Sequence, residues 1–224
     1  MLADAISSSL PMSVGVALSP IPAAAILIIL MSARAASNAL AFLVGWVAGI
    51  LTIGLVVSLM PGLLTTRGEP TQLSGLTRVA LGAALLLLAG HQWRQRPAPE
   101  APVKVPPLLA RLDSIGVMQS SITGFLLSAI HPKNLILNAA GAAAIDASVL
   151  DAGTQYIALV IFALIASVSI TVPIAAYFVA RRMVGAVLGR WKDWLIRNNA
   201  QVMVALLLIL GVLLIARGLH ILLA

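Results

Sequence analysis

One lysine lies deep within an apolar stretch of this sequence, in the motif His-Pro-Lys-Asn at residues 131–134. A lysine at the centre of a bilayer costs about 2.5 kcal/mol or more on insertion scales, so it needs a partner there. No acidic residue within the apolar stretches could pair with Lys133, since Asp146 and Asp151 flank a predicted loop. A substrate phosphate, sulfate or carboxylate would then be the counterion. The structural alternative is that Lys133 caps a carbonyl or faces a water-filled cavity.

A second proline motif, Ser-Pro-Ile-Pro at residues 19–22, lies midway along another apolar stretch. Proline in a helix interior costs roughly 3 kcal/mol, but at the first helical position it is favoured. We therefore expect Pro20 and Pro132 to begin half-helices, with Ser19 and His131 as the preceding N-caps. The free amides of each half-helix would point into the membrane centre, where they favour an anion. A simple proline kink in a packed helix is the alternative.

Polar side chains surround these prolines. Asn134 and Asn138 lie one helical turn apart, so both could bond a headgroup from the same face. His131 could titrate near neutral pH or act only as a cap. Paired carboxylates and His–acid pairs are missing from the sequence, so we expect no enzyme and no catalytic residues. With no cysteine and no intramembrane carboxylate, we also expect no metal and no cofactor.

The elements that hold these residues must be membrane helices. Of the 224 residues, 61% are hydrophobic and 9% are charged, whereas a soluble domain carries about 25% charged residues. A bilayer span needs about 20 apolar residues. Such stretches fall near residues 8–31, 38–61, 76–93, 117–145, 154–180 and 200–222. We therefore predict an all-α integral membrane protein of six transmembrane helices, of which helices 1 and 4 are broken by proline.

The two halves of the chain resemble each other. Residues 15–22 and 124–132 share the pattern Gly-x-x-Leu-Ser-x-Ile followed by proline. Three spans in each half would give two inverted three-helix repeats, as in many secondary transporters. We predict repeats over 1–93 and 117–224, joined by a proline-rich basic linker over 94–116. Chance similarity between two segments rich in Leu, Ala and Gly is the alternative.

The charge pattern predicts the orientation. The net charge of +7 would suggest nucleic acid in a soluble protein, but the basic residues cluster in loops between apolar spans, so we expect no nucleic acid. Ten of them follow the odd-numbered spans, against Arg67, Arg78 and Arg217 on the other side. The positive-inside rule then places both termini outside the inner (plasma) membrane. The pattern of residues 181–199 predicts a basic amphipathic cytoplasmic helix with tryptophans at headgroup depth. An ordinary basic loop is the alternative.

Two spans have further local features. Ala41, Gly45 and Gly49 recur every fourth residue in the second span, a spacing that lets helices approach closely. The fifth span is locally polar and bent over residues 167–173, which contain two serines, a threonine and a proline. These polar groups could line a pathway or bond to carbonyls of their own helix.

Three segments together resemble the lysine exporter (LysE) superfamily. They are residues 18–22 (Leu-Ser-Pro-Ile-Pro), 42–46 (Phe-Leu-Val-Gly-Trp) and 131–134. Within the superfamily the chain is similar to the peptidoglycolipid-addressing or sulfolipid-addressing (GAP) group, over nearly its whole length. Relatives move amino acids, metal ions or cell-envelope glycolipids. The resemblance implies a pathway core of Ser19, Pro20, Pro22, Pro132, Lys133 and Asn134. Amino-acid exporters usually carry Pro-Gly-Pro and Asn-Pro-Lys instead, which argues against an amino-acid substrate.

The sequence therefore favours a transporter or flippase that exports an anionic lipid or glycolipid. Lys133 would hold the acid group, while Ser19, Asn134 and Asn138 orient polar atoms. Export of a small anionic or zwitterionic solute, such as an amino acid, is the first alternative. A non-transporting membrane accessory subunit is the second, and a membrane enzyme acting on lipid phosphates is the third. Membrane lipids are expected partners, with a homodimer or accessory membrane proteins as the protein partners.

Overall fold

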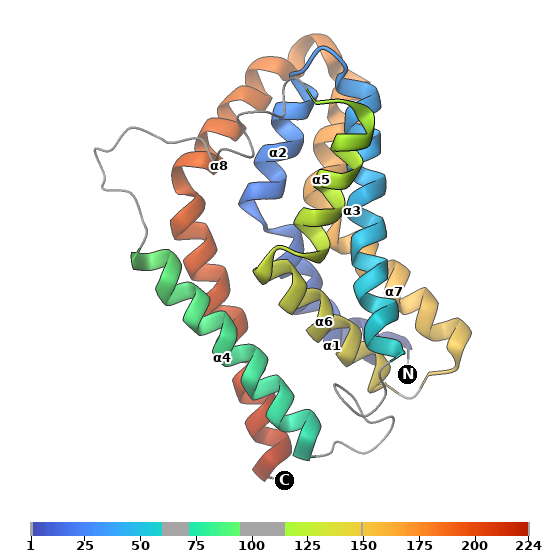
Figure 1. Ribbon diagram of the computed structural model, residues 1–224, viewed down its shortest axis with the longest axis vertical. Helices are drawn as coiled ribbons and strands as arrows, with labels where there is room; N and C mark the ends of the chain where they lie inside the picture. Colours follow the sequence, from blue (N-terminus) through green and yellow to red (C-terminus); the bar gives the residue numbers. More distant parts are fainter. Residues whose placement is uncertain (1, 60–71, 95–114, 149, 224) are drawn as a thin grey trace.

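A computed structural model describes residues 2–59, 72–94, 115–148 and 150–223. Every regular element in these ranges is an α-helix, as the sequence predicts (Figure 1). The helices are α1 (Leu2–Ala17), α2 (Pro20–Leu30), α3 (Ala35–Ser58), α4 (Gln72–Arg94), α5 (Val117–Ala129), α6 (Pro132–Asp146), α7 (Ala152–Ala166) and α8 (Val168–Leu223). Most of the predicted linker at 94–116 lies outside the described residues.

Several helices are long and apolar enough to cross a membrane. Helices α3, α4 and the Ala200–Leu223 part of α8 each satisfy this criterion alone. Two bent pairs satisfy it together: α1 with α2, bent by 53°, and α7 with the Val168–Val179 part of α8, bent by 62°. The described residues thus hold three to five candidate spans of a multi-pass membrane protein. The predicted span at 117–145 is divided between α5 and α6, so the count of six remains a prediction.

The last third of the chain differs from the prediction. The sequence predicts three separate elements at 154–180, 181–199 and 200–222, whereas the structure has one unbroken helix, α8, from Val168 onward. Figure 1 shows this helix turning over one end of the bundle before it runs back down. Residues 181–199 contain no proline, and most residue types cost well under about 1 kcal/mol in a helix. A change from apolar to polar side chains therefore does not end the helix.

The break in the fifth span lies between α7 and α8, at Ser167. The Ser167 hydroxyl donates to the Ala163 carbonyl at 2.6 Å, and the Thr171 hydroxyl donates to the Ser167 carbonyl at 3.1 Å. Ser167 and Thr171 thus bond to carbonyls of their own turns, which is the second of the two roles that the sequence left open, whereas the Ser169 hydroxyl is buried without a partner in the described part of the chain.

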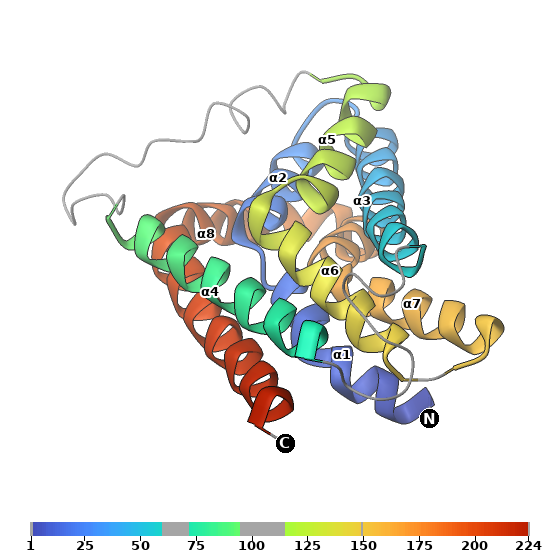
Figure 2. The ribbon, with the colours of Figure 1, turned by 60° about the horizontal axis from the view of Figure 1, so that its bottom comes forward.

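Glycines allow the closest helix contacts. A Cβ on Gly45 of α3 would lie 1.8 Å from the Ser121 carbonyl oxygen, and one on Gly124 of α5 would lie 2.2 Å from that of Phe42. The predicted close approach of the second span is therefore correct, and its neighbour is α5. In Figure 2 the C-terminal part of α8 runs along α4, on one side of the molecule.

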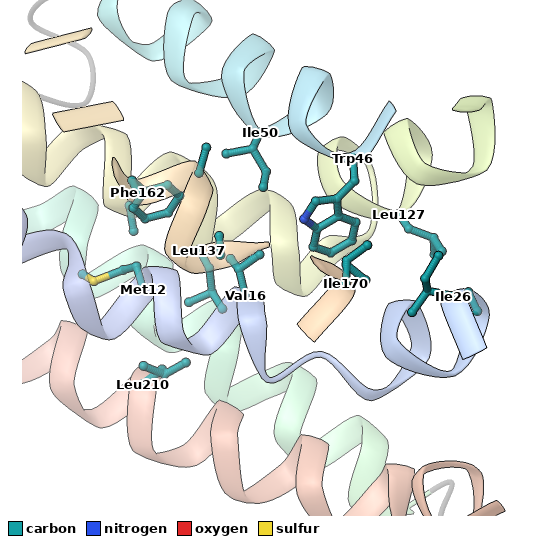
Figure 3. Packing of buried hydrophobic residues seen from close by; sticks show 14 of the residues in the cluster. Met12, Val16, Ile26, Trp46, Ile50, Leu127, Leu137, Phe162, Ile170 and Leu210 are labelled. Atoms are coloured by element: carbon teal, nitrogen blue, oxygen red, sulfur yellow. The ribbon is translucent and has the colours of Figure 1, made fainter. Parts of the chain in front are cut away.

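All eight of the described helices contribute to the apolar core, and Figure 3 shows residues of α1, α2, α3, α5, α6, α7 and α8 packed together in it. Its largest side chain is Trp46, which is fully buried, together with Phe162 and Leu137. Met12 and Val16 of α1 reach the same cluster. Core residues thus lie on both sides of the break between α1 and α2.

Candidate functional site

Both proline motifs break their helices as the sequence predicts. Helix α1 ends at Ala17 and α2 begins at Pro20, while α5 ends at Ala129 and α6 begins at Pro132. Each proline occupies the start of its helix, where the missing amide removes no hydrogen bond. The cost of each break therefore falls on the carbonyls at the end of the preceding half-helix, which lose their partners.

The two breaks meet inside the protein. The Ser19 hydroxyl donates a hydrogen bond of 2.7 Å to Oδ1 of Asn134, and both residues are at most 1% exposed. Ser19 and His131 occupy the N-cap positions of α2 and α6, as predicted, but neither side chain forms a cap hydrogen bond. For Ser19 the reason is packing: the hydroxyl satisfies Oδ1 of Asn134, which would otherwise be a buried acceptor without a donor.

The Lys133 side chain reaches the last turn of α1, just before the break in the first span. Its ammonium group donates a 2.7 Å hydrogen bond to the carbonyl of Gly15, and the residue is 2% exposed. Gly15 belongs to the last turn of α1, where carbonyls lack partners and a cation is favoured by the helix dipole. Lys133 therefore caps a carbonyl, as the structural alternative proposed. This bond uses one of its three N–H donors, and in the described ranges Lys133 forms no ion pair.

The two asparagines of α6 cap the other broken helix. Nδ2 of Asn134 donates to the Leu127 carbonyl at 2.8 Å, and Nδ2 of Asn138 donates to the Ser128 carbonyl at 2.9 Å. Leu127 and Ser128 lie in the last turn of α5. Side chains from α6 therefore satisfy carbonyls at the ends of both α1 and α5. In a bilayer each unsatisfied carbonyl would cost several kcal/mol, so these contacts allow both breaks to persist.

Some polar atoms of the site have no partner. Among the residues that the structure describes, Oδ1 of Asn138 and Nδ1 of His131 are buried without a hydrogen bond. Of the remaining predicted site residues, Pro20 and Pro22 are buried, whereas Pro132 is exposed. A buried acceptor and a possible donor thus lie on either side of Lys133 along the chain.

The site is closed in this structure, because Ser19, Lys133, Asn134 and Asn138 are each at most 2% exposed. An open hollow lies elsewhere, on the middle part of α8, lined by Arg190, Trp191, Trp194 and Leu195. The two tryptophans are more than half exposed, which is the arrangement expected of a helix at headgroup depth.

Sequence reasoning missed a buried carboxylate. Asp146 is 4% exposed, although it was expected to flank a loop. Nε2 of Gln155 donates to Oδ1 of Asp146 at 2.8 Å and to Oγ of Ser58 at 3.3 Å, which links α6, α7 and α3. Thirteen residues of helix, or about 20 Å, separate Asp146 from Lys133, so it is not the missing counterion. The polar Gln155 within an apolar span was the sequence feature that could have indicated a buried polar partner.

The comparisons with known proteins give one match. A family model described as "Sap, sulfolipid-1-addressing protein" matches residues 10–220. No curated protein and no solved structure matches the chain significantly. The matched residues include both proline motifs and every predicted site residue.

Proposed function

We propose, from the fact that the chain belongs to the sulfolipid-1-addressing protein family, that it is a transporter or flippase exporting an anionic lipid or glycolipid across the inner membrane. The family description names a sulfolipid, which is an anionic lipid, and the addressing of this lipid rather than a reaction. The candidate spans supply the membrane domain that such a role requires.

The observation that carries the proposal is the state of Lys133. Its ammonium group is buried at the junction of two broken helices, and its hydrogen-bond partner among the described residues is one neutral carbonyl. A neutral carbonyl satisfies a donor but does not neutralise a charge. Because an isolated charge in an apolar interior is expensive, a site of this kind favours an anionic guest. A sulfate or phosphate headgroup would accept from the two remaining N–H groups.

Opening the site requires two contacts to break. Lys133 to Gly15 and Ser19 to Asn134 both connect the first broken helix to α6. In the proposed cycle the headgroup replaces the Gly15 carbonyl as the acceptor for Lys133, while Ser19 and Asn134 turn to its polar atoms. One half of the protein then moves relative to the other around the proline breaks, as in alternating access.

The inverted repeat belongs to the same proposal. Helix α5 packs along α3, and its counterpart α1 packs along α7, so each first half-helix contacts the second span of the opposite half. This exchange of partners supports two halves of opposite orientation. Placement of both termini outside the cytoplasm is supported by exposed basic residues near the turn of α8, namely Arg190 and Arg197.

The test uses the purified full chain in liposomes that contain a trace of phosphatidylglycerol with a fluorescent headgroup-proximal label. Chemical quenching from outside measures how fast the labelled lipid crosses the bilayer. The proposal expects faster crossing of labelled phosphatidylglycerol with the protein present than in empty liposomes, and little effect on labelled phosphatidylcholine. Loss of the anionic preference in Lys133→Gln would support a role for the charge, because glutamine retains an N–H donor.

Lys104→Gln serves as the matched control, because it removes the same charge from the predicted linker. If labelled phosphatidylglycerol crosses the bilayer as fast with Lys133→Gln as with the wild type, the proposed role of Lys133 is wrong. If no lipid crosses faster than in empty liposomes, the accessory-subunit alternative is favoured. Uptake or release of a soluble anion without lipid movement would instead favour the solute exporter.

A further inference from the structure

Two arginines lie close together within the membrane helices, away from the Lys133 site. Arg78 belongs to α4 and Arg217 to α8, and these two helices pack along each other. Each lies six residues from its helix end at Gln72 or Leu223, which is about 9 Å along the axis. Figure 1 places these ends of α4 and α8 at the end of the bundle where both termini lie.

The helix crossing holds the two arginines at the same level. A Cβ on Gly75 would lie 3.1 Å from the Gly218 carbonyl oxygen, and one on Gly82 would lie 2.7 Å from that of Gly211. The two helices are therefore antiparallel and in contact at two points. Arg78 lies between these points on α4, and Arg217 lies between them on α8. Such close backbones leave the arginines little freedom to move apart along the helices.

One buried donor of this pair has no acceptor in the described part of the chain. Nη1 of Arg217 donates to the Ser8 carbonyl at 2.8 Å. Nη1 of Arg78 is buried and has no partner, and neither guanidinium forms an ion pair within the described ranges. Two like charges without an anion are unfavourable in a membrane helix pair, where charged groups are normally paired. The arrangement therefore lacks one component, which is a negative charge.

We infer that Arg78 and Arg217 bind the phosphate or sulfate headgroup of an anionic membrane lipid. Guanidinium groups match the oxygens of such headgroups in two-point contacts, and basic pockets between membrane helices bind anionic lipids. The surrounding side chains favour a lipid over a free ion. Leu73, Leu76 and Leu219 are 43–55% exposed on the same two helices and offer an apolar surface to acyl chains.

This site does not depend on the proposed transport function. It joins α4 to the end of α8 and to α1 through Ser8, whereas the Lys133 site joins α6 to the breaks. A lipid bound here would stabilise the α4–α8 pair whether or not that lipid is the molecule exported. From the sequence alone, these two arginines were interpreted only as signals of membrane topology.

The experiment places the full chain in nanodiscs of equimolar phosphatidylglycerol and phosphatidylcholine and measures retained lipid by native mass spectrometry after release. We expect phosphatidylglycerol to remain bound to the wild type, and Arg78→Gln to lower its affinity roughly tenfold, the effect of losing charge-assisted hydrogen bonds. Arg78→Lys should bind with intermediate affinity. Arg94→Gln is the matched control, since Arg94 is exposed at the other end of α4.

Thermal unfolding separates binding from folding. In phosphatidylcholine alone, Arg78→Gln should be at least as stable as the wild type, because it removes a repulsion. Phosphatidylglycerol should raise the apparent Tm of the wild type and of Arg94→Gln, but not of Arg78→Gln. Equal retention of phosphatidylglycerol by the wild type and Arg78→Gln would overturn the inference. Stabilisation by inorganic phosphate without retained phosphatidylglycerol would overturn the assignment to a lipid.

Discussion

The ammonium group of Lys133 lies 2.7 Å from the carbonyl oxygen of Gly15, so a single side chain of α6 holds the end of α1. Two opposing effects determine the stability of a variant that lacks this contact. Removal of Lys133 leaves the Gly15 carbonyl without a donor, but it also removes a buried charge from an apolar interior.

We therefore expect Lys133→Met to change the free energy of unfolding by only about 1 kcal/mol in either direction. For a chain of this length, this corresponds to a shift of roughly 2–4 °C in Tm. Thermal unfolding in detergent measures it. We expect this small change in stability together with a loss of lipid movement. If Lys133 were purely structural, Lys133→Met would instead lose much stability, while the molecules that still fold would move lipid normally.

The hydrogen bond from Ser19 to Asn134 can be measured by a double-mutant cycle. Ser19→Ala and Asn134→Ala should be coupled by about 0.6 kcal/mol, the average for side-chain hydrogen bonds between membrane helices. Asn134→Ala should be the more harmful single change, because it also leaves the Leu127 carbonyl without a donor. Additive effects of the two substitutions on unfolding would show that the contact contributes nothing.

The contact between α3 and α5 predicts a strong effect at Gly45. In Gly45→Ala the new Cβ would meet the Ser121 carbonyl, which cannot move without its helix. We expect a loss of about 1–3 kcal/mol, measured as a lower Tm. Gly90→Ala is the matched control, since nothing lies within 4 Å of its Cβ, and its greater helix propensity should raise the Tm slightly. Equal shifts in the two variants would contradict the close approach.

The positions of two helix breaks could be predicted from the sequence, because a proline acts on its own turn of helix. Pro20 and Pro132 begin their helices as expected. The partners of the neighbouring side chains could not be predicted. Ser19 and Asn134 are 115 positions apart, and their contact depends on how the halves pack. The same packing offers the Gly15 carbonyl to Lys133, so the lysine could be recognised as unusual while its acceptor could not.

Composition predicted the helical membrane class but not the helix ends in the second half. Hydropathy separates residues 181–199 from their neighbours, yet hydropathy reports the environment and not the backbone, and α8 continues through them. Asp146 illustrates the same limit. A polar residue at the end of an apolar stretch can face water or turn inward, and the buried Asp146 accepts a hydrogen bond from Gln155 of the next helix.

Gln155 supplies the next prediction. Gln155→Ala removes the hydrogen bond to Asp146, a buried acceptor, and the longer one to Ser58. We expect a destabilisation of about 1–3 kcal/mol, since hydrogen bonds to charged groups are stronger than neutral ones. Gln201→Ala, at an exposed position of α8, should change the Tm little. Similar Tm values for both variants would show that the hydrogen bond from Gln155 to the Asp146 carboxylate does not stabilise the fold.

The start of α7 should depend on pH through Asp151, which caps the helix from outside the apolar span. Hydrogen bonds from the Thr154 hydroxyl and then its amide hold the pKa of the Asp151 carboxyl below its usual range. Because the pKa is depressed in the folded state, the stabilisation is complete above the unfolded pKa of about 3.9 and is lost as the pH falls through the folded value.

Hydrogen-exchange protection of the Thr154 amide, corrected for intrinsic exchange, should therefore fall in acid in the wild type. Asp151→Asn should keep its protection at low pH, since asparagine is an equally favoured N-cap and does not titrate. Asp151→Ala should lose protection at every pH, because it offers no acceptor to the amide. If the protection of the Thr154 amide falls in acid equally in the wild type and in Asp151→Asn, acid destabilises the start of α7 through another group. The Asp151 carboxyl would then not control the helix start.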